Sequence, residues 1–214
     1  MAVYRLEEGK IYFPNPTLAE PDGLLAVGGD LSVPRLLLAY SNGIFPWYSK
    51  GEPILWWCPK ERFIIRPEDI HISRSMKKYM KKHQIEVLFN RDFADTIHRC
   101  RMKRELMEEG TWITDEMEEA YVALHDAGYA ASVEAYVDGR LAGGLYGVVI
   151  GRAFFGESMF SDAENGSKLA LVKLAEHLSQ KGFCMIDCQF HTDHLESMGG
   201  VRIGYEEYMG LLEL

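Results

Sequence analysis

The chain has 214 residues, of which 47% are hydrophobic and 26% charged, and its formal net charge is −9. This composition is typical of a globular protein with a real core, and the acidic balance argues against a surface coated for non-specific nucleic-acid binding. No run of apolar residues is long enough for a transmembrane helix, and the first residues lack the pattern of a signal peptide. We therefore expect a cytoplasmic protein with no membrane segment.

The stretch over residues 12–62 is rich in turn formers and aromatic side chains. Three prolines and three glycines fall within 14–32, where we predict an ordered loop. Ser32 caps a helix that runs through Tyr40. Three tryptophans follow, which are typical either of a small domain's core or of a stacking surface for a flat ligand. They are Trp47, Trp56 and Trp57.

A short basic helix is predicted next, opened by Ser73 and running to His83. Five positive side chains recur at a spacing of three and four residues, which places them on one face. They are Arg74, Lys77, Lys78, Lys81 and Lys82. Such a face is either simply solvated or binds a phosphate backbone, and its contrast with the acidic chain favours phosphate binding.

The rest of the chain alternates between helical and strand patterns, identified by capping residues, apolar spacing and turn residues. In chain order we predict a helix over 92–109, a helix from Thr114 that buries Met117, Tyr121 and Leu124, a hairpin over 131–150 that turns at Asp138-Gly139, a strand over 154–160, a helix over 166–180, a buried strand over 183–190 and a final amphipathic segment. Gly143 and Gly144 in the hairpin allow either a ligand or another backbone to approach closely.

Three polar residues interrupt the apolar strands. Glu157 is a lone carboxylate within 154–160, and alternation along 183–190 places Asp187 and Gln189 on one face. Ionised groups are rarely buried without a partner or a task. Because a strand, a helix and a second strand bring these segments together, we expect the three residues to meet in one cleft.

Several other motifs are too weak to define a site. The four scattered cysteines are interpreted as small buried thiols. His191, Asp193 and His194 have side chains that can bind a metal. The His-x-x-His spacing of His191 and His194 is a weak signal, because no clear third ligand and no glutamate of an H-E-x-x-H motif accompany it. No glycine-rich loop opens the helix at Gly166, and no nucleophile elbow is present. We therefore expect neither a metal nor a cofactor.

Seven blocks of sequence, in their order along almost the whole chain, resemble the bacterial leucyl/phenylalanyl-tRNA–protein transferase family. The blocks are PDGLLAVGGDLS, RLLLAYSNGIFPWYSKGEPILWWCP, HISRSMKK, GTWIT, GGLYGV, FFGESMFS and IDCQ followed by a histidine. The resemblance implies an α/β (α+β) protein. A small N-terminal α+β domain would cover residues 1–62, and a GNAT-like catalytic domain with a mixed, mostly antiparallel sheet flanked by helices would cover 63–214.

The resemblance also implies the activity. The family moves leucine or phenylalanine, and less readily methionine, from aminoacyl-tRNA to the α-amine of proteins that begin with Arg or Lys, which makes N-degrons for proteolysis. It implies that Glu157, Asp187 and Gln189 are catalytic, with Glu157 in the acceptor site. The family proposal of a proton relay through Gln189 competes with our interpretation, in which Asp187 orients an amide that aims the amine. We expect a monomer.

Matching positions assign the remaining site residues, each with core packing as the alternative. The aminoacyl pocket would be lined by Leu145, Phe154, Gly156, Leu174 and Ile186. The terminal adenosine would stack on Tyr40, Trp47 and Trp112. The acceptor stem of the tRNA would lie on the basic face of the helix over 73–83.

Departures from the family pattern concern Cys58, where the family has Ser, and Ala131, where it has His. An Arg common in the family is replaced near Gly204-Tyr205, and the tail is short. Two other functions compete with the transferase. The first is an acyl-CoA acyltransferase on the same scaffold, which needs a pyrophosphate loop. The second is a tRNA- or degron-binding protein without turnover, against which the intact Glu157, Asp187 and Gln189 argue.

Overall fold

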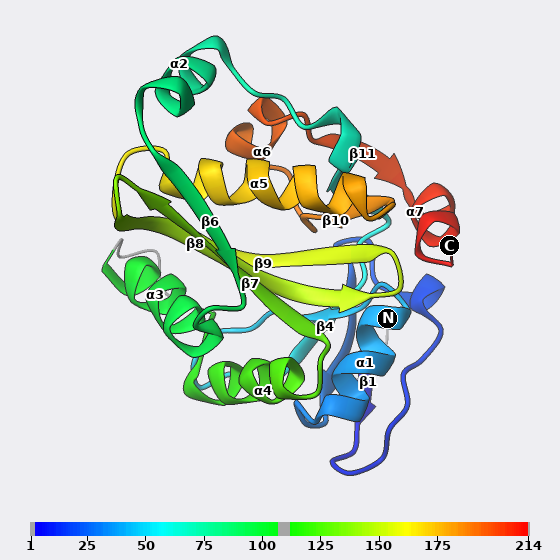
Figure 1. Ribbon diagram of the computed structural model, residues 1–214. Coiled ribbons are helices and arrows are strands. Elements are labelled where there is room, and N and C mark those ends of the chain that lie inside the picture. Colours follow the sequence, from blue (N-terminus) through cyan, green and yellow to red (C-terminus); the bar gives the residue numbers. More distant parts are fainter. Residues whose placement is uncertain (1–2, 107–111, 214) are drawn as a thin grey trace.

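The computed structural model describes residues 3–106 and 112–213, and shows two β-sheets with helices packed around them (Figure 1). The end of the predicted helix over 92–109 and the Gly110-Thr111 part of the GTWIT block lie outside the described residues. Within the described ranges, no helix combines the length and the apolar character that a membrane span needs.

The N-terminal part forms a small sheet in the order β1-β2-β4-β3, in which β1 and β2 are parallel and the other neighbouring strands are antiparallel. Its elements are β1 (Tyr4–Leu6), η1 (Pro16–Leu18), β2 (Leu24–Gly28), α1 (Val33–Ser41), β3 (Phe45–Pro46) and β4 (Leu55–Trp57). The segment predicted as an ordered loop over 14–32 therefore contains a strand, β2. The predicted helix after Ser32 is confirmed as α1.

The larger sheet has the order β11-β5-β10-β9-β8-β7-β6, and β9 with β10 is its one parallel pair among the described strands. The strands are β5 (Glu61–Ile65), β6 (Ile85–Phe89), β7 (Ala130–Val137), β8 (Arg140–Ile150), β9 (Ala153–Ser161), β10 (Met185–Asp187) and β11 (Val201–Gly204). The predicted mixed, mostly antiparallel α/β class is confirmed. A domain division after residue 62 falls inside β5 and stays a proposal.

Helices cover both faces of the larger sheet, with α5 on one side and α3 and α4 on the other (Figure 1). They are η2 (Pro67–Asp69), α2 (Arg74–Lys82), α3 (Phe93–Leu106), α4 (Asp115–Asp126), α5 (Gly166–Gln180), α6 (Asp193–Ser197) and α7 (Tyr205–Leu212). Two of the three predicted caps form, because the Ser73 and Thr114 hydroxyls each accept a backbone N–H three residues later, at 3.2 Å. The prediction for Ser32 is wrong, because its side chain makes no cap hydrogen bond at the start of α1.

The hairpin of β7 and β8 turns at Asp138 and Gly139, whose φ values of 49° and 78° are both positive, as a type I′ turn requires. Further along β8, a Cβ on Gly143 would lie 2.6 Å from the Gly166 carbonyl carbon. The close neighbour at Gly143 is therefore the backbone that begins α5. This packing fixes the start of α5 against the sheet.

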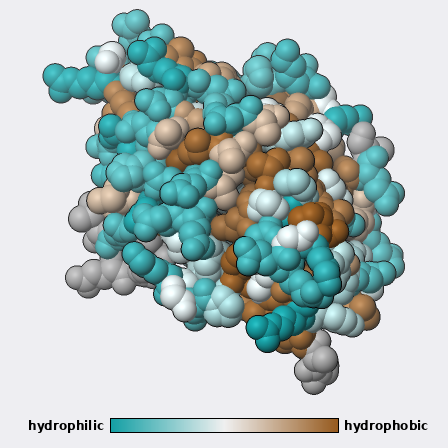
Figure 2. All heavy atoms as spheres, turned by 90° about the horizontal axis from the view of Figure 1, so that it is seen from below, coloured by the Kyte–Doolittle hydropathy of each residue, from teal (hydrophilic) through white to brown (hydrophobic). Residues whose placement is uncertain are grey.

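Two clusters of buried side chains form the core. One joins α1 and the small sheet to α3, α4 and one face of the larger sheet, and the other fills the space between the larger sheet, α5 and α2. Seen from below, hydrophobic residues gather on the side of the molecule where α1 lies, and hydrophilic residues dominate the opposite side (Figure 2). The first of the two core clusters shows that the N-terminal part packs on the larger sheet through a shared core.

Candidate active site

A mostly apolar cavity of about 210 Å³ lies where β10 ends, between β8, β9, α5 and the aromatic residues that follow β3. Every predicted substrate-binding residue except Tyr40 lines it, namely Trp47, Trp112, Leu145, Phe154, Gly156, Leu174 and Ile186. Glu157 and Gln189 line it too. The structure therefore brings two of the three predicted catalytic residues to one apolar pocket.

Glu157 lies on β9 and is held by hydroxyl groups from two helices of other parts of the chain. Tyr40 of α1 donates to its Oε1 at 2.8 Å, and Tyr121 of α4 donates to its Oε2 at 3.2 Å. The oxygens of the two tyrosine hydroxyls also lie in close contact with each other. The Gln189 side-chain amide donates to Oε1 at 3.4 Å. The carboxylate is thus fixed in one orientation at the pocket wall.

The environment of Glu157 changes its acidity. Burial raises the pKa of this carboxyl from 4.5 to about 7, although the hydrogen bonds from Tyr40 and Tyr121 act in the opposite direction. The side chain is half-buried at the pocket wall. Glu157 therefore changes its charge near neutral pH.

The strand pattern predicts Asp187 in the same cleft as Glu157 and Gln189, but Asp187 is not part of the pocket lining. It is fully buried behind the pocket, where its Oδ2 forms an ion pair with the equally buried Arg62 and accepts a hydrogen bond from Tyr208 at 2.7 Å. Its Oδ1 accepts the backbone N–H of Gln189 at 2.8 Å. Asp187 thus orients Gln189 through the main chain of that residue.

The predicted strand over 183–190 is shorter than expected, since β10 covers only Met185–Asp187. Gln189 adopts a φ of 57°, a left-handed conformation that is unfavourable for a residue with a side chain. The strict alternation along the strand therefore ends before Gln189. This backbone turn directs the amide of Gln189 toward Glu157 rather than alongside Asp187.

Tyr40 has no exposed surface and is not part of the pocket lining. A fully buried ring offers no face to an adenosine, so the expected stacking role does not fit its position. Its hydroxyl instead holds Glu157. Trp47 is 41% exposed at the pocket and meets Trp112 and Phe190 edge-on or tilted, so an aromatic surface does border the cavity.

Several residues of the site could not be predicted from the sequence pattern. Tyr121 has a core-like helical spacing, and only its hydroxyl distinguishes it from packing. Arg104 of α3 lines the pocket, where its guanidinium lies 3.7 Å over the Trp112 ring and its Nε donates to Ser158 at 3.1 Å. The other unpredicted lining residues are Phe45, Pro46, Tyr146, Ser158, Met159, Leu171, Cys188, Phe190, Thr192 and Leu195.

The basic face predicted on the helix over 73–83 is present on α2, and all five of its cationic side chains are exposed. The opposite side of α2 packs through Met76 into the same core cluster as Phe154, Leu174 and Ile186 of the pocket wall. The cationic surface therefore lies on an element that shares its packing with the pocket.

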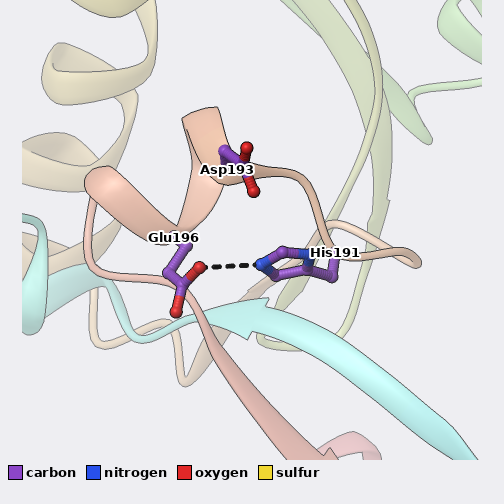
Figure 3. A group of neighbouring side chains, drawn as sticks. All are labelled: His191, Asp193 and Glu196. Carbon is purple, nitrogen blue, oxygen red and sulfur yellow. Dashed lines mark hydrogen bonds and ion pairs between the residues drawn. The ribbon is translucent and has the colours of Figure 1, made fainter.

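The candidate metal ligands form a different group from the one considered in the sequence. His191, Asp193 and Glu196 place one ligand atom each within 4.8 Å of one another, whereas His194 is outside the group. The His191 Nε2 and Glu196 Oε2 atoms lie within hydrogen-bonding distance at 2.9 Å, and the Asp193 carboxylate lies beside them (Figure 3). Asp193 and Glu196 are exposed, so ordinary surface charge accounts for this cluster, and we assign no metal to it.

The start of α5 gives no support to an acyl-CoA site. A Cβ on Gly166 would lie 1.9 Å from the Ala142 carbonyl oxygen, so β8 covers this end of the helix. The Ser167 N–H already donates to the Ser161 hydroxyl at 2.9 Å. A pyrophosphate would need such N–H groups in the open.

The departures from the family pattern lie away from the cavity. Cys58, Ala131 and Gly204 are absent from its lining within the described part of the chain. Burial raises the pKa of the Cys58 thiol to about 11, so this side chain stays neutral beside the Arg62–Asp187 pair.

The fold and the pocket define a mixed α/β protein with a carboxylate at one end of an apolar cavity. Residues 64–213 match the sequence model of the leucyl/phenylalanyl-tRNA protein transferases, and residues 29–60 match the N-terminal domain of the same proteins. The chain belongs to this family of aminoacyltransferases, as its sequence blocks predict.

Curated relatives agree with this assignment. The chain is 49% identical to the leucyl/phenylalanyl-tRNA–protein transferase of Desulforapulum autotrophicum, over 98% of this chain and 91% of that protein. It is 55% identical to that of Desulfatibacillum aliphaticivorans, over 93% and 85%. A predicted acetyltransferase from Clostridium acetobutylicum with acetyl-CoA is 13% identical, with a TM-score of 0.40 over 58% of this chain and 88% of that one.

Proposed function

We propose that this protein transfers leucine or phenylalanine, and less readily methionine, from aminoacyl-tRNA to the α-amine of proteins that begin with Arg or Lys. The products would be N-degrons, and the enzyme would act in the cytoplasm as a monomer. The observation that carries the proposal is the Gln189 amide 3.4 Å from the Glu157 carboxylate at the polar end of an apolar pocket.

The reaction is aminolysis of an activated ester. The α-amine attacks the carbonyl carbon, the C–N bond forms, and the ester C–O bond breaks as the amine proton passes to the ribose oxygen. An α-amine has a reference pKa of about 8, so a useful fraction is neutral near pH 7. The enzyme then acts mainly by holding the two substrates together and excluding water.

A covalent intermediate on the enzyme is not needed for this reaction. Cys188 is the thiol that lines the pocket, and burial raises its pKa well above the ordinary value. The thiolate, which is the nucleophilic form, is therefore scarce near neutral pH. Direct attack of the amine on the ester is the simpler route.

In this proposal Glu157 binds the cationic end of the acceptor protein. An ionised carboxylate forms strong charge-assisted hydrogen bonds with a guanidinium or ammonium group. Gln189, which is held next to Glu157, accepts a hydrogen bond from the attacking amine and aims it. Asp187 contributes indirectly, because it fixes the backbone of Gln189.

The apolar side chains of the pocket receive the aminoacyl group. Leu145, Phe154 and Leu174 are almost completely buried and line an apolar cavity, which would receive a bulky apolar side chain. Such a pocket discriminates between similar side chains by about 1–3 kcal/mol, so some transfer of methionine is expected. The adenosine would lie on Trp47 and Trp112, and the acceptor stem on the basic face of α2.

The proposal is tested by transfer of labelled leucine from charged tRNA to a peptide that begins with Arg. Identical peptides that begin with acetyl-Arg or Asp serve as acceptor controls. We expect product with the free Arg peptide alone. Transfer to the Asp peptide would contradict the acceptor rule, and tRNA binding without any product would favour the binding-only function.

Two variants sharpen the assignment of the acceptor site. Glu157→Gln should raise KM for the Arg peptide at least tenfold, because it removes the charge that binds the cation. Glu134→Gln is the matched control, since Glu134 is a buried carboxylate bonded to Ser132 and Thr96 and is not part of the pocket lining. An equal effect of both changes would contradict a specific role for Glu157.

A further inference from the structure

Tyr208 of the C-terminal helix α7 contacts Asp187 at the end of β10, on the side away from the pocket. Tyr208 has no exposed surface. Its hydroxyl donates to Asp187 Oδ2 at 2.7 Å and accepts from Arg62 Nη2 at 3.1 Å. Arg62 in turn forms the ion pair with Asp187 and donates to the Gly43 carbonyl oxygen at 2.9 Å. One hydroxyl therefore links α7 to both members of the buried ion pair.

The ring of Tyr208 is held as firmly as its hydroxyl. The Arg62 guanidinium lies 4.5 Å from the centre of this ring on one side and 4.8 Å from the centre of the Phe45 ring. A Cβ on Gly43 would come within 2.7 Å of Tyr208 Cε1, which only a glycine avoids. These contacts pack against the ring in a position that directs the hydroxyl at Asp187.

The two carboxylate oxygens of Asp187 contact different groups. Oδ2 faces Arg62 and Tyr208, whereas Oδ1 accepts the backbone N–H of Gln189. That N–H belongs to a residue in the left-handed conformation, which persists only where its surroundings hold it. A rotation of the Asp187 carboxylate would release the backbone of Gln189 and move its amide away from Glu157.

We propose that Tyr208 is a positioning residue for the transfer step, and that it holds Gln189 at Glu157 through the Asp187 carboxylate. The inference rests on the proposed function, because Gln189 is the group that aims the attacking amine there. Tyr208 and Arg62 are not part of the pocket lining within the described residues, so Tyr208 acts without touching either substrate.

The decisive variant is Tyr208→Phe, which keeps the ring over Arg62 and removes only the hydroxyl. We expect kcat to fall about tenfold, while KM for aminoacyl-tRNA and for the Arg peptide stays within about twofold. Tyr48→Phe is the matched control, because Tyr48 is 6% exposed and loses a hydroxyl bonded to Thr114 instead. A kcat for Tyr208→Phe within twofold of the parent protein would overturn the proposal, even if its Tm fell.

A double-mutant cycle separates positioning from general loss of structure. If Tyr208 acts through Gln189, adding Tyr208→Phe to Gln189→Ala should cause almost no further loss in the single-turnover rate. Losses that multiply would mean that Tyr208 acts independently of Gln189, and would also overturn the proposal.

Amide hydrogen exchange supplies a readout that needs no activity. The Gln189 amide should exchange at least tenfold faster in Tyr208→Phe than in the parent protein or in Tyr48→Phe. Unchanged exchange would refute the positioning role. Failure of the parent protein to transfer leucine would refute the proposed function alone, since exchange still reports whether Tyr208 holds Gln189.

Discussion

The Tyr40 hydroxyl donates to the Glu157 carboxylate at 2.8 Å, and this bond joins α1 of the N-terminal part to β9 of the larger sheet. A fully buried tyrosine from one part of the chain therefore sets the orientation of the pocket carboxylate in the other. This orientation depends on the packing of the two parts, which share one core cluster.

Removal of this hydroxyl should shift the pH dependence of acceptor binding. The hydrogen bond from Tyr40 favours the ionised form of Glu157 and so opposes the effect of burial. In Tyr40→Phe the pKa of Glu157 should rise further above 7, by up to about one unit. The midpoint in a plot of the acceptor KM against pH should move to higher pH, with Tyr48→Phe as the control. An unchanged midpoint would mean that Glu157 does not govern acceptor binding.

Stability should also report on Glu157. Its pKa in the folded protein is about 7, above the ordinary value of 4.5, so the folded state holds this proton more tightly than the unfolded chain. The resulting stabilisation is complete below pH 4.5 and is lost as the pH rises through 7, by up to about 3 kcal/mol. Glu157→Gln lacks this titration. The free energy of unfolding of the variant minus that of the parent protein, both measured in urea, should therefore increase between pH 4.5 and 8. If this difference did not change with pH, the raised pKa of Glu157 would be contradicted.

Features determined by nearby residues could be predicted from the sequence. Ser73 and Thr114 cap helices where expected, and Asp138-Gly139 makes the expected tight turn. The order of β9, α5 and β10 was also predictable, and it brings Glu157 close to Gln189. Each of these signals lies within a few residues of the structure it specifies.

Features determined by distant residues could not be predicted in the same way. The left-handed turn at Gln189 depends on Asp187, whose orientation depends on Arg62, a residue 125 positions earlier. Likewise, the burial of Tyr40 depends on its contact with Tyr121, 81 positions later. Alternation along a strand carries no information about such partners, so it predicted a continuous strand through Gln189.

The paired glycines of β8 and β9 offer a direct test of the pocket. A Cβ on Gly156 would meet only ordinary contacts, the nearest being the Asp187 carbonyl oxygen at 3.7 Å. Gly156→Ala should therefore fold normally but narrow the cavity, which costs a bulky phenylalanyl group more than a leucyl group, about tenfold in kcat/KM against about threefold. Competition between leucyl-tRNA and phenylalanyl-tRNA in one reaction measures the ratio of their kcat/KM values.

Gly147, which pairs with Gly156 across the two strands, is the control for this experiment. A Cβ there would lie 2.1 Å from the Phe155 carbonyl oxygen, so Gly147→Ala should lower the free energy of unfolding by several kcal/mol. If Gly156→Ala reduced transfer of leucine and phenylalanine equally, Gly156 would not be part of the aminoacyl pocket.

The basic face of α2 should make the affinity for tRNA depend on the salt concentration. Each phosphate neutralised by a cationic side chain contributes about 0.7–0.9 to the slope of log affinity against log salt concentration. Combined Lys77→Glu, Lys78→Glu and Lys81→Glu changes should raise KM for aminoacyl-tRNA at least tenfold and reduce that slope by about 2. Because phosphate contacts carry little sequence information, the effect should be similar for leucyl- and phenylalanyl-tRNA. Lys10→Glu, at an exposed lysine of the N-terminal part, should leave the slope unchanged, and an unaltered slope in the triple variant would exclude α2 from tRNA binding.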